Sequence, residues 1–145
     1  MNNLENIIGE LCKVILPIHE ESYLGNTDSS IAICTLSSIN LLKKISNSEI
    51  LNYISIAGRL LSENKGIDSI IKYVNQNKKI KTIIVCGKEV WGHKAGHSLF
   101  ALHKNGIDNH GRIINSTSPD PFLTVTKSEI HHFQNNINLV NINSK

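Results

Sequence analysis

The apolar positions of the chain follow two alternating spacings, and this alternation predicts an α/β fold. Short runs of consecutive apolar, often β-branched residues are typical of buried strands. The strands predicted from such runs are 31–36, 53–57 and 80–86. Apolar residues that recur every three or four positions are typical of helices packed on one face. The helices predicted between and after these strands are 39–45, 67–74 and a helix that follows His93 and continues to about residue 105.

The last third of the chain predicts three more elements and a turn. We interpret residues 112–115 as a short fourth strand, followed by a rigid turn at 116–121. Thr126 and Glu129 have the spacing of a capping box, which predicts a helix over about 127–135. The apolar residues of 137–142 then predict a final strand. Ser46 and Glu49 have the same capping-box spacing and predict one further short helical turn.

The N-terminal segment carries an apolar stripe of its own. The stripe consists of Leu4, Ile7, Ile8, Leu11 and Ile15. It predicts an amphipathic helix over residues 1–16 that ends before Pro17. Packing on the core is the usual role of such a helix, and docking of a partner is the alternative.

Strand and helix alternate throughout, so we expect one domain over residues 1–145, with its core at 31–142 and a mainly parallel sheet covered by helices on both faces. The carboxyl ends of parallel strands meet at one edge of a sheet, where ligands bind in this class of fold. The loops that would meet there are 35–38, 58–64, 87–93 and 115–121. All four are rich in Gly, Ser, Thr, Asn or charged residues, so a ligand site is expected at this edge.

Composition narrows the classes of protein that fit. The 145 residues are 40% hydrophobic and 19% charged, with a net charge of only +3, and no basic patch with interleaved aromatic residues occurs. Nucleic-acid binding is therefore not expected. The three cysteines are far apart in sequence, which favours a reducing cytoplasm over a disulfide scaffold. Neither a membrane span nor a signal peptide is expected, because no apolar run is long enough and acidic residues interrupt the N-terminal segment.

His93 lies in the loop after the third predicted strand, between Gly92 and Gly96. The dinucleotide and phosphate-loop glycine patterns are both absent from the chain. His93 and His97 have the spacing of a zinc helix, but Lys94 stands where the catalytic Glu of such a helix would be. Cys86, at the end of the strand, is either an inert core thiol or a cofactor contact.

A third interpretation is a corrinoid site. Corrinoid proteins with a histidine lower ligand often carry Asp-x-His-x-x-Gly, and residues 91–96 resemble the His-x-x-Gly half, with Trp91 in place of Asp. Neutral imidazole is a good cobalt ligand, and its other ring nitrogen needs an orienting partner. The pattern alone leaves that partner open.

Long, ordered stretches of the chain resemble a known family, the corrinoid-carrying A subunit of tetrahydromethanopterin S-methyltransferase from methane-producing archaea. The likeness covers roughly residues 23–142. The stretches that carry it are 31–38, 56–59, 62–68, 86–96, 101–108 and 111–114. The resemblance implies a Rossmann-like domain that binds a cobamide, either cobalamin or 5-hydroxybenzimidazolylcobamide. It also implies that His93 is the lower axial ligand to cobalt and the catalytic residue. The other residues implied to line the cofactor are Thr35, Leu36, Ser37, Arg59, Glu63, Asn64, Gly87 and Gly92.

In this family, cobalt takes a methyl group from methyltetrahydromethanopterin and passes it to coenzyme M. The chain departs from the family pattern at His97, where Gln is common, and at Ser62, where Thr is usual. The family's membrane-bound protein continues to a C-terminal transmembrane helix, whereas this sequence ends at Lys145. We therefore expect a soluble, cytoplasmic methyl carrier that needs partner methyltransferases for turnover and does not itself couple to sodium translocation. The alternatives are a corrinoid storage, delivery or sensing module without turnover, and an enzyme of nucleotide or zinc type.

Overall fold

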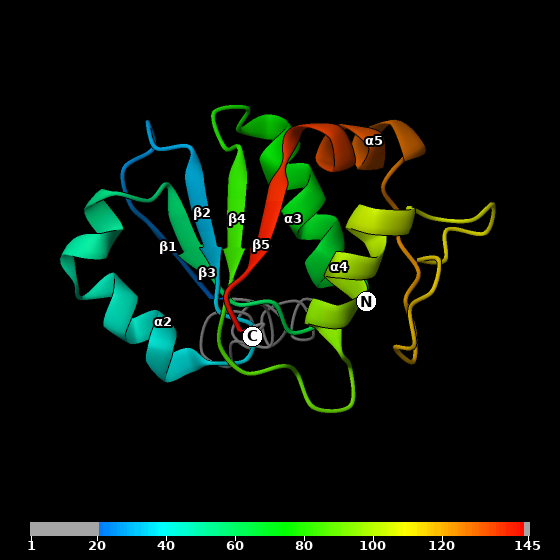
Figure 1. Cartoon of the computed structure of the whole chain (residues 1–145), viewed down its shortest axis with the longest axis horizontal. Helices are drawn as coiled ribbons and strands as arrows, with labels where there is room; N and C mark the ends of the chain where they lie inside the picture. Colours follow the sequence, from blue (N-terminus) through cyan, green and yellow to red (C-terminus); the bar gives the residue numbers. More distant parts are fainter. Residues whose placement is uncertain (1–20, 144–145) are drawn as a thin grey trace, which may run out of the picture.

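A five-stranded, mostly parallel sheet forms the centre of the molecule (Figure 1). The computed structural model describes residues 21–143, so the N-terminal helix predicted over 1–16 lies outside the described residues. The strands are β1 (Ser22–Leu24), β2 (Ile31–Cys34), β3 (Ile56–Gly58), β4 (Thr82–Val85) and β5 (Asn138–Asn141). They are arranged in the order β1-β3-β2-β4-β5, and only β1 runs antiparallel to its neighbour.

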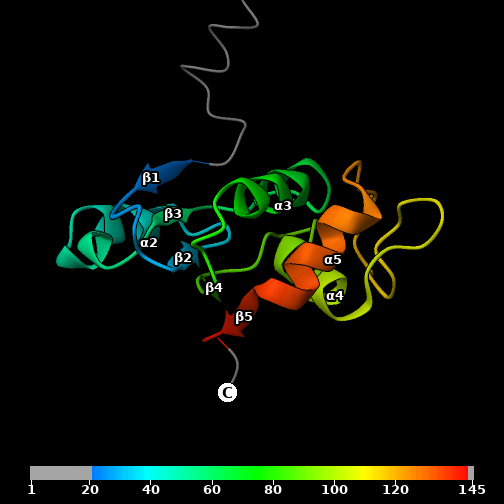
Figure 2. The same cartoon turned by 90° about the horizontal axis from the view of Figure 1, so that it is seen from above.

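Helices cover both faces of the sheet, as predicted (Figure 2). The helices are α2 (Ile39–Ser46), α3 (Lys65–Gln76), α4 (Ala95–Asn105) and α5 (Lys127–Asn136), with a 3-10 turn η1 (Glu49–Asn52) after α2. In Figure 2, α2 lies on one side of the sheet, and α3, α4 and α5 lie on the other. The chain is therefore an α/β protein with a Rossmann-like arrangement.

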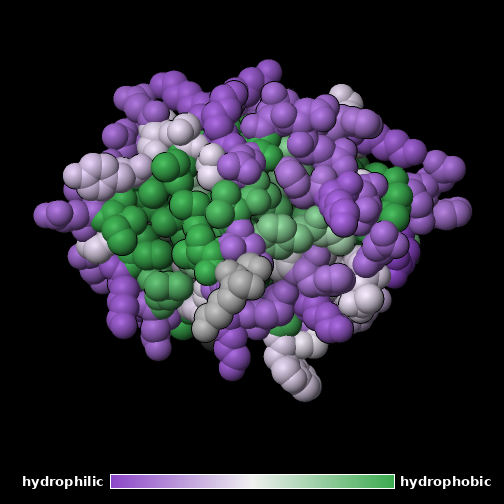
Figure 3. All heavy atoms as spheres, viewed as in Figure 1, coloured by the Kyte–Doolittle hydropathy of each residue, from purple (hydrophilic) through white to green (hydrophobic). Residues whose placement is uncertain are grey.

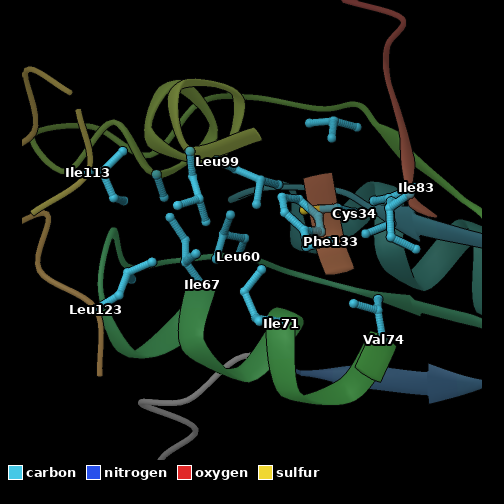
Figure 4. Close-up of a cluster of buried hydrophobic side chains, with 14 of the residues drawn as sticks. Cys34, Leu60, Ile67, Ile71, Val74, Ile83, Leu99, Ile113, Leu123 and Phe133 are labelled. Atoms are coloured by element: carbon cyan, nitrogen blue, oxygen red, sulfur yellow. The ribbon is translucent and has the colours of Figure 1, made fainter. Parts of the chain in front are cut away.

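The alternation of side chains along the strands divides the core between the two faces. Ala32 and Cys34 of β2 and Ile83 of β4 pack with α3, α4 and α5 in the larger cluster, which includes Ile71 of α3 (Figure 4). Ala57 of β3 packs with α2 in the smaller cluster. This division follows from the period of two in a strand, which places neighbouring residues on opposite faces.

Several local predictions are confirmed by their capping contacts. Thr126 and Glu129 form the predicted capping box at the start of α5. Gly106 ends α4, with its backbone N–H donating to Leu102 and a φ of 75° that favours glycine. The short turn after α2 is present, but Ser48 caps it, since its side chain accepts from Ile50 N, rather than Ser46.

The fourth strand predicted at 112–115 is wrong. Residues 106–125 fold on themselves, and Ile113 and Arg112 make only isolated bridges, to Ile107 and Phe122. Ile113 is fully buried in the larger core cluster without joining the sheet, whereas Ile114 is exposed. Strand β1 was not predicted. Within residues 21–143, no helix is long and apolar enough to cross a membrane.

Candidate functional site

The loops after β2 and β4 are bonded together at the carboxyl edge of the sheet. Ser37 Oγ donates a hydrogen bond to Lys88 O at 2.8 Å, and Lys88 N donates to Ser38 Oγ at 2.7 Å. Gly87 is required here because it has a φ of 83° and because a Cβ would collide with Thr35 O. The predicted meeting of the 35–38 and 87–93 loops is therefore confirmed.

His93 and Glu63 form the central contact of the edge. His93 Nδ1 lies 2.9 Å from Glu63 Oε1, although thirty positions separate the two residues. The other carboxylate oxygen, Glu63 Oε2, accepts a hydrogen bond from Asp120 N at 3.0 Å. The contact thus brings together three of the four predicted loops, at 58–64, 87–93 and 115–121.

Glu63 is almost fully buried, at 1% exposure, yet its surroundings favour the charged form. Burial alone would raise the pKa of this carboxyl. The backbone N–H groups of Glu63 and Asp120, together with His93, donate to it and lower the pKa below its ordinary value. Glu63 is consequently a fixed negative charge behind the imidazole.

The charge on Glu63 determines how His93 presents its ring. An ionised carboxylate only accepts hydrogen bonds, so the contact places a proton on Nδ1. In the neutral ring Nε2 is then the unprotonated nitrogen, available as a ligand. The side chain of His93 is 56% exposed, and a Cβ built on the neighbouring Gly92 meets no atom within 4 Å. The ring therefore borders open space at the sheet edge.

Among residues 21–143, three residues other than glycine have a left-handed backbone, and all three lie at or next to the loops of this edge. They are Leu36 (φ 53°), Lys94 (φ 51°) and Asn115 (φ 67°). Such conformations carry strain for L-residues and tend to gather at functional sites. Lys94 directly follows His93, so its conformation fixes where the chain turns from the His93 loop into α4.

Two further polar residues hold the start of α4. Glu89 accepts from the backbone N–H groups of Gly96 at 3.0 Å and His97 at 2.8 Å, so its carboxylate caps the helix. His97 Nε2 accepts from Thr117 N at 3.0 Å and ties α4 to the 115–121 loop. This contact occupies the nitrogen that a zinc helix would use. Among residues 21–143, no group of three or more His, Cys, Asp or Glu side chains could hold a metal ion.

The chain is similar to known proteins over most of its length. A family model for the A subunit of tetrahydromethanopterin S-methyltransferase matches residues 14–145. The chain belongs to this family. It is 38% identical to the A subunit of the putative methyltransferase Mtx from Methanosarcina acetivorans, over 86% of this chain and 59% of the relative.

Two further relatives place the chain in the same family. It is 39% identical to the Mtx A subunit of Methanosarcina barkeri, over 86% of this chain and 60% of the relative. It is 35% identical to an A subunit of tetrahydromethanopterin S-methyltransferase from Methanothermobacter marburgensis, over 87% of this chain and 52% of the relative. The chain thus spans six-tenths or less of the length of these curated relatives.

The remaining residues that the family resemblance implies are spread over the edge. Thr35 and Leu36 are buried, and Asn64 Nδ2 donates to Asp120 O at 3.0 Å, so these three shape the loops. Arg59 follows β3, and its Nε is buried without a hydrogen-bond partner among the described residues. Cys86 is buried, and burial raises the pKa of its thiol, which favours the protonated form.

A cavity of about 680 Å³ lies beside this edge, on the β5 side of α4. Leu36, Gly96 and Phe100 contribute to its wall, and Lys104 and several asparagines line it as well. Glu89 of the His93 loop and His97 of α4 also line the cavity, so it adjoins this loop.

The sequence analysis named His93 and Glu63 as candidate site residues. It did not predict that they contact each other, or that Asp120 N donates a hydrogen bond to Glu63. The Asp-x-His-x-x-Gly pattern of other corrinoid proteins would place the carboxylate two residues before the histidine, where this chain has Trp91. That side chain is 93% exposed. Glu63, from the loop before α3, supplies the missing carboxylate instead. In the sequence, Glu63 is visible only as a polar residue in the predicted 58–64 loop. Its contact with His93 depends on how the loops pack, which the sequence does not show.

Proposed function

We propose that this chain binds a cobamide with His93 as the lower axial ligand to cobalt, and carries a methyl group for a methyltransferase. The observation that supports this most is the Glu63–His93 pair, which leaves Nε2 as the free nitrogen on an open edge of the sheet. Metal-bound histidines usually donate their other ring N–H to a carboxylate or carbonyl.

The residues around His93 are suited to holding a cobamide. Glu63 holds the imidazole in one tautomer and makes it a better donor to a metal, and Asp120 N holds Glu63 in turn. Gly92 leaves room directly beside the ring, where a side chain would stand in the way of a flat macrocycle. The bound cobamide would supply the cobalt chemistry of methyl transfer, while the protein supplies binding and orientation.

The methyl donor and acceptor belong to the same proposal. The curated relatives are named as subunits of methyltransferases, and the tetrahydromethanopterin enzyme is among them. We therefore propose methyltetrahydromethanopterin as the donor, coenzyme M as the acceptor, and separate methyltransferase proteins as the partners that load and unload the carrier.

The first test is the binding of hydroxocobalamin, followed by its visible spectrum. Wild type is expected to bind it with a shift of the spectrum that reports an imidazole ligand, and His93→Ala should lose the shift and bind more weakly. His131→Ala is the matched control, because His131 is exposed on α5 and away from the edge. If wild type and His93→Ala give the same spectrum, the assignment of His93 as the ligand is wrong.

A further inference from the structure

Trp91 is the most exposed large apolar side chain among residues 21–143. It is 93% exposed, whereas the next, Tyr53, is 72% exposed, and neither core cluster of the described chain includes Trp91. It is also the only tryptophan in the sequence. A single exposed apolar residue is common on protein surfaces. The position of Trp91, rather than its exposure alone, therefore indicates a role.

Trp91 and His93 lie on one closed turn. Lys94 N donates a hydrogen bond to Val90 O at 3.0 Å, which closes this turn. Both of its ends are anchored, because Val90 and Ala95 are buried in the larger core cluster. The tip of the turn is exposed, and the loop that carries it projects beyond the carboxyl edge of the sheet (Figure 1). The backbone thus keeps the tryptophan and the histidine close together.

Gly92 separates the two residues without placing a side chain between them. Its φ of 81° is in the left-handed region that favours glycine. A Cβ built on Gly92 would meet no atom within 4 Å, so the space around the tip is open. No side chain of the turn therefore stands between the indole of Trp91 and the imidazole of His93.

We propose that Trp91 packs against the face of the cobamide that His93 approaches, and so contributes to its binding. This inference rests on the proposed function. A histidine that binds cobalt from one side of a flat macrocycle carries the rest of its turn to the same side, so Trp91 lies within reach of that face. Ligand sites commonly combine aromatic walls with a few polar groups that fix orientation. Glu63 and His93 supply the polar groups, and Trp91 supplies the aromatic one.

A larger apolar surface lies elsewhere on the molecule. Figure 3 shows hydrophobic side chains gathered over α2 and the adjoining strands, on the face viewed in Figure 1. By the alternation along β4 and β5, Ile84 and Val140 belong to the face opposite the larger core cluster, and neither cluster includes them. This surface lies on the face of the sheet rather than on the loops of its carboxyl edge. It does not share a turn with a candidate metal ligand, as Trp91 does.

Titration with hydroxocobalamin tests the contact through affinity. Trp91→Ala should bind about 10-fold to 100-fold more weakly than wild type, because an apolar contact is lost. The His93-dependent spectral shift should remain at saturation, since His93 is intact. Trp91→Phe should recover part of the affinity, because it restores an aromatic ring. Tyr53→Ala is the matched control and should bind as wild type, since Tyr53 precedes β3 and so lies at the opposite edge of the sheet.

Trp91 can also be observed directly, because no other tryptophan contributes a signal. In chain labelled with fluorotryptophan, the single fluorine resonance should shift between water and heavy water as an exposed indole does when no cobamide is present. Most of this solvent shift should be lost when hydroxocobalamin is bound. A resonance that stays fully solvent-exposed at saturation would leave Trp91 for a protein partner, contrary to the proposal.

These measurements separate the contact of Trp91 from the proposed function. If wild type binds no cobamide, both proposals are wrong. If wild type shows the His93-dependent spectral shift but Trp91→Ala binds equally tightly, the role of Trp91 is wrong and that of His93 stands.

Discussion

Glu63 determines which ring nitrogen of His93 is unprotonated, because its carboxylate contacts Nδ1. It fixes the proton on Nδ1, so its removal should change the ligand nitrogen rather than the shape of the loop. In Glu63→Gln, the amide oxygen can still accept from Asp120 N, while the amide NH2 can donate to Nδ1 and shift the proton to Nε2. We expect cobamide affinity to fall about 10-fold to 100-fold, the usual cost of losing such a partner.

Titration of hydroxocobalamin, read from the His93-dependent spectral shift, measures this loss. Glu49→Gln is the matched control, because Glu49 is exposed on η1. Equal affinities for Glu63→Gln and wild type would mean that the pairing does not orient the ligand.

The same residue predicts a dependence of stability on pH. The pKa of Glu63 is lowered in the folded protein, because backbone N–H groups and His93 donate to the charged form and outweigh burial. Its bonds therefore stabilise the fold fully above the ordinary glutamate pKa and are lost as the pH falls through the lowered value. The difference in unfolding free energy between wild type and Glu63→Gln should narrow over that acidic range, as measured by urea unfolding at several pH values.

Among the elements, α3 carries one buried carboxylate in its first turn that bonds it to residues 124 and 125, in addition to its apolar packing in the core. Asp68 accepts hydrogen bonds from Thr124 N and Val125 N, and from the hydroxyl of Thr124 at 2.9 Å. Asp68→Asn replaces one acceptor oxygen by a donor that faces these N–H groups. We expect a loss of about 1 to 3 kcal/mol in the free energy of unfolding, the cost of a buried group left unsatisfied.

Urea denaturation measures this loss, with Asp28→Asn as the matched control. Asp28 pairs with Lys79 at 2.7 Å, but both side chains are largely exposed. Such surface pairs contribute at most about 1 kcal/mol, so the control should change stability little. Equal effects of the two substitutions would mean that the Asp68 contacts are not important for folding.

The length and burial of each strand explain which strands could be predicted from the sequence. Strands β2, β3 and β4 were predictable because buried parallel strands leave runs of apolar residues. Strand β1 was not, since it has three residues and only Tyr23 is half-buried. Residues 112–115 resembled a strand because Ile113 and Ile114 are adjacent and β-branched, but only Ile113 is buried. His93 could be found from a local pattern, whereas its bond to Glu63 depends on loops that only the fold brings together.

At the scale of the whole molecule, the exposure of His93 bears on whether the proposed cobamide site would serve a methyl carrier or a corrinoid store. The His93 loop lies at the edge of the sheet, its side chain is 56% exposed, and open space adjoins Gly92. On the proposed function, we expect a cofactor held beside His93 to remain accessible to a partner protein. A storage protein would instead be expected to enclose its ligand.

Alkylation by methyl iodide tests this difference without any partner protein. If a reduced cobamide is held beside His93 as proposed, it should react at a rate close to that of free reduced cobamide, because the His93 side chain is 56% exposed and solvent would reach the cofactor. The disappearance of the reduced spectrum gives the rate, and Glu49→Gln should behave as wild type. A rate far below that of the free cofactor would mean that the bound cobamide is shielded, and would favour storage or delivery over methyl transfer.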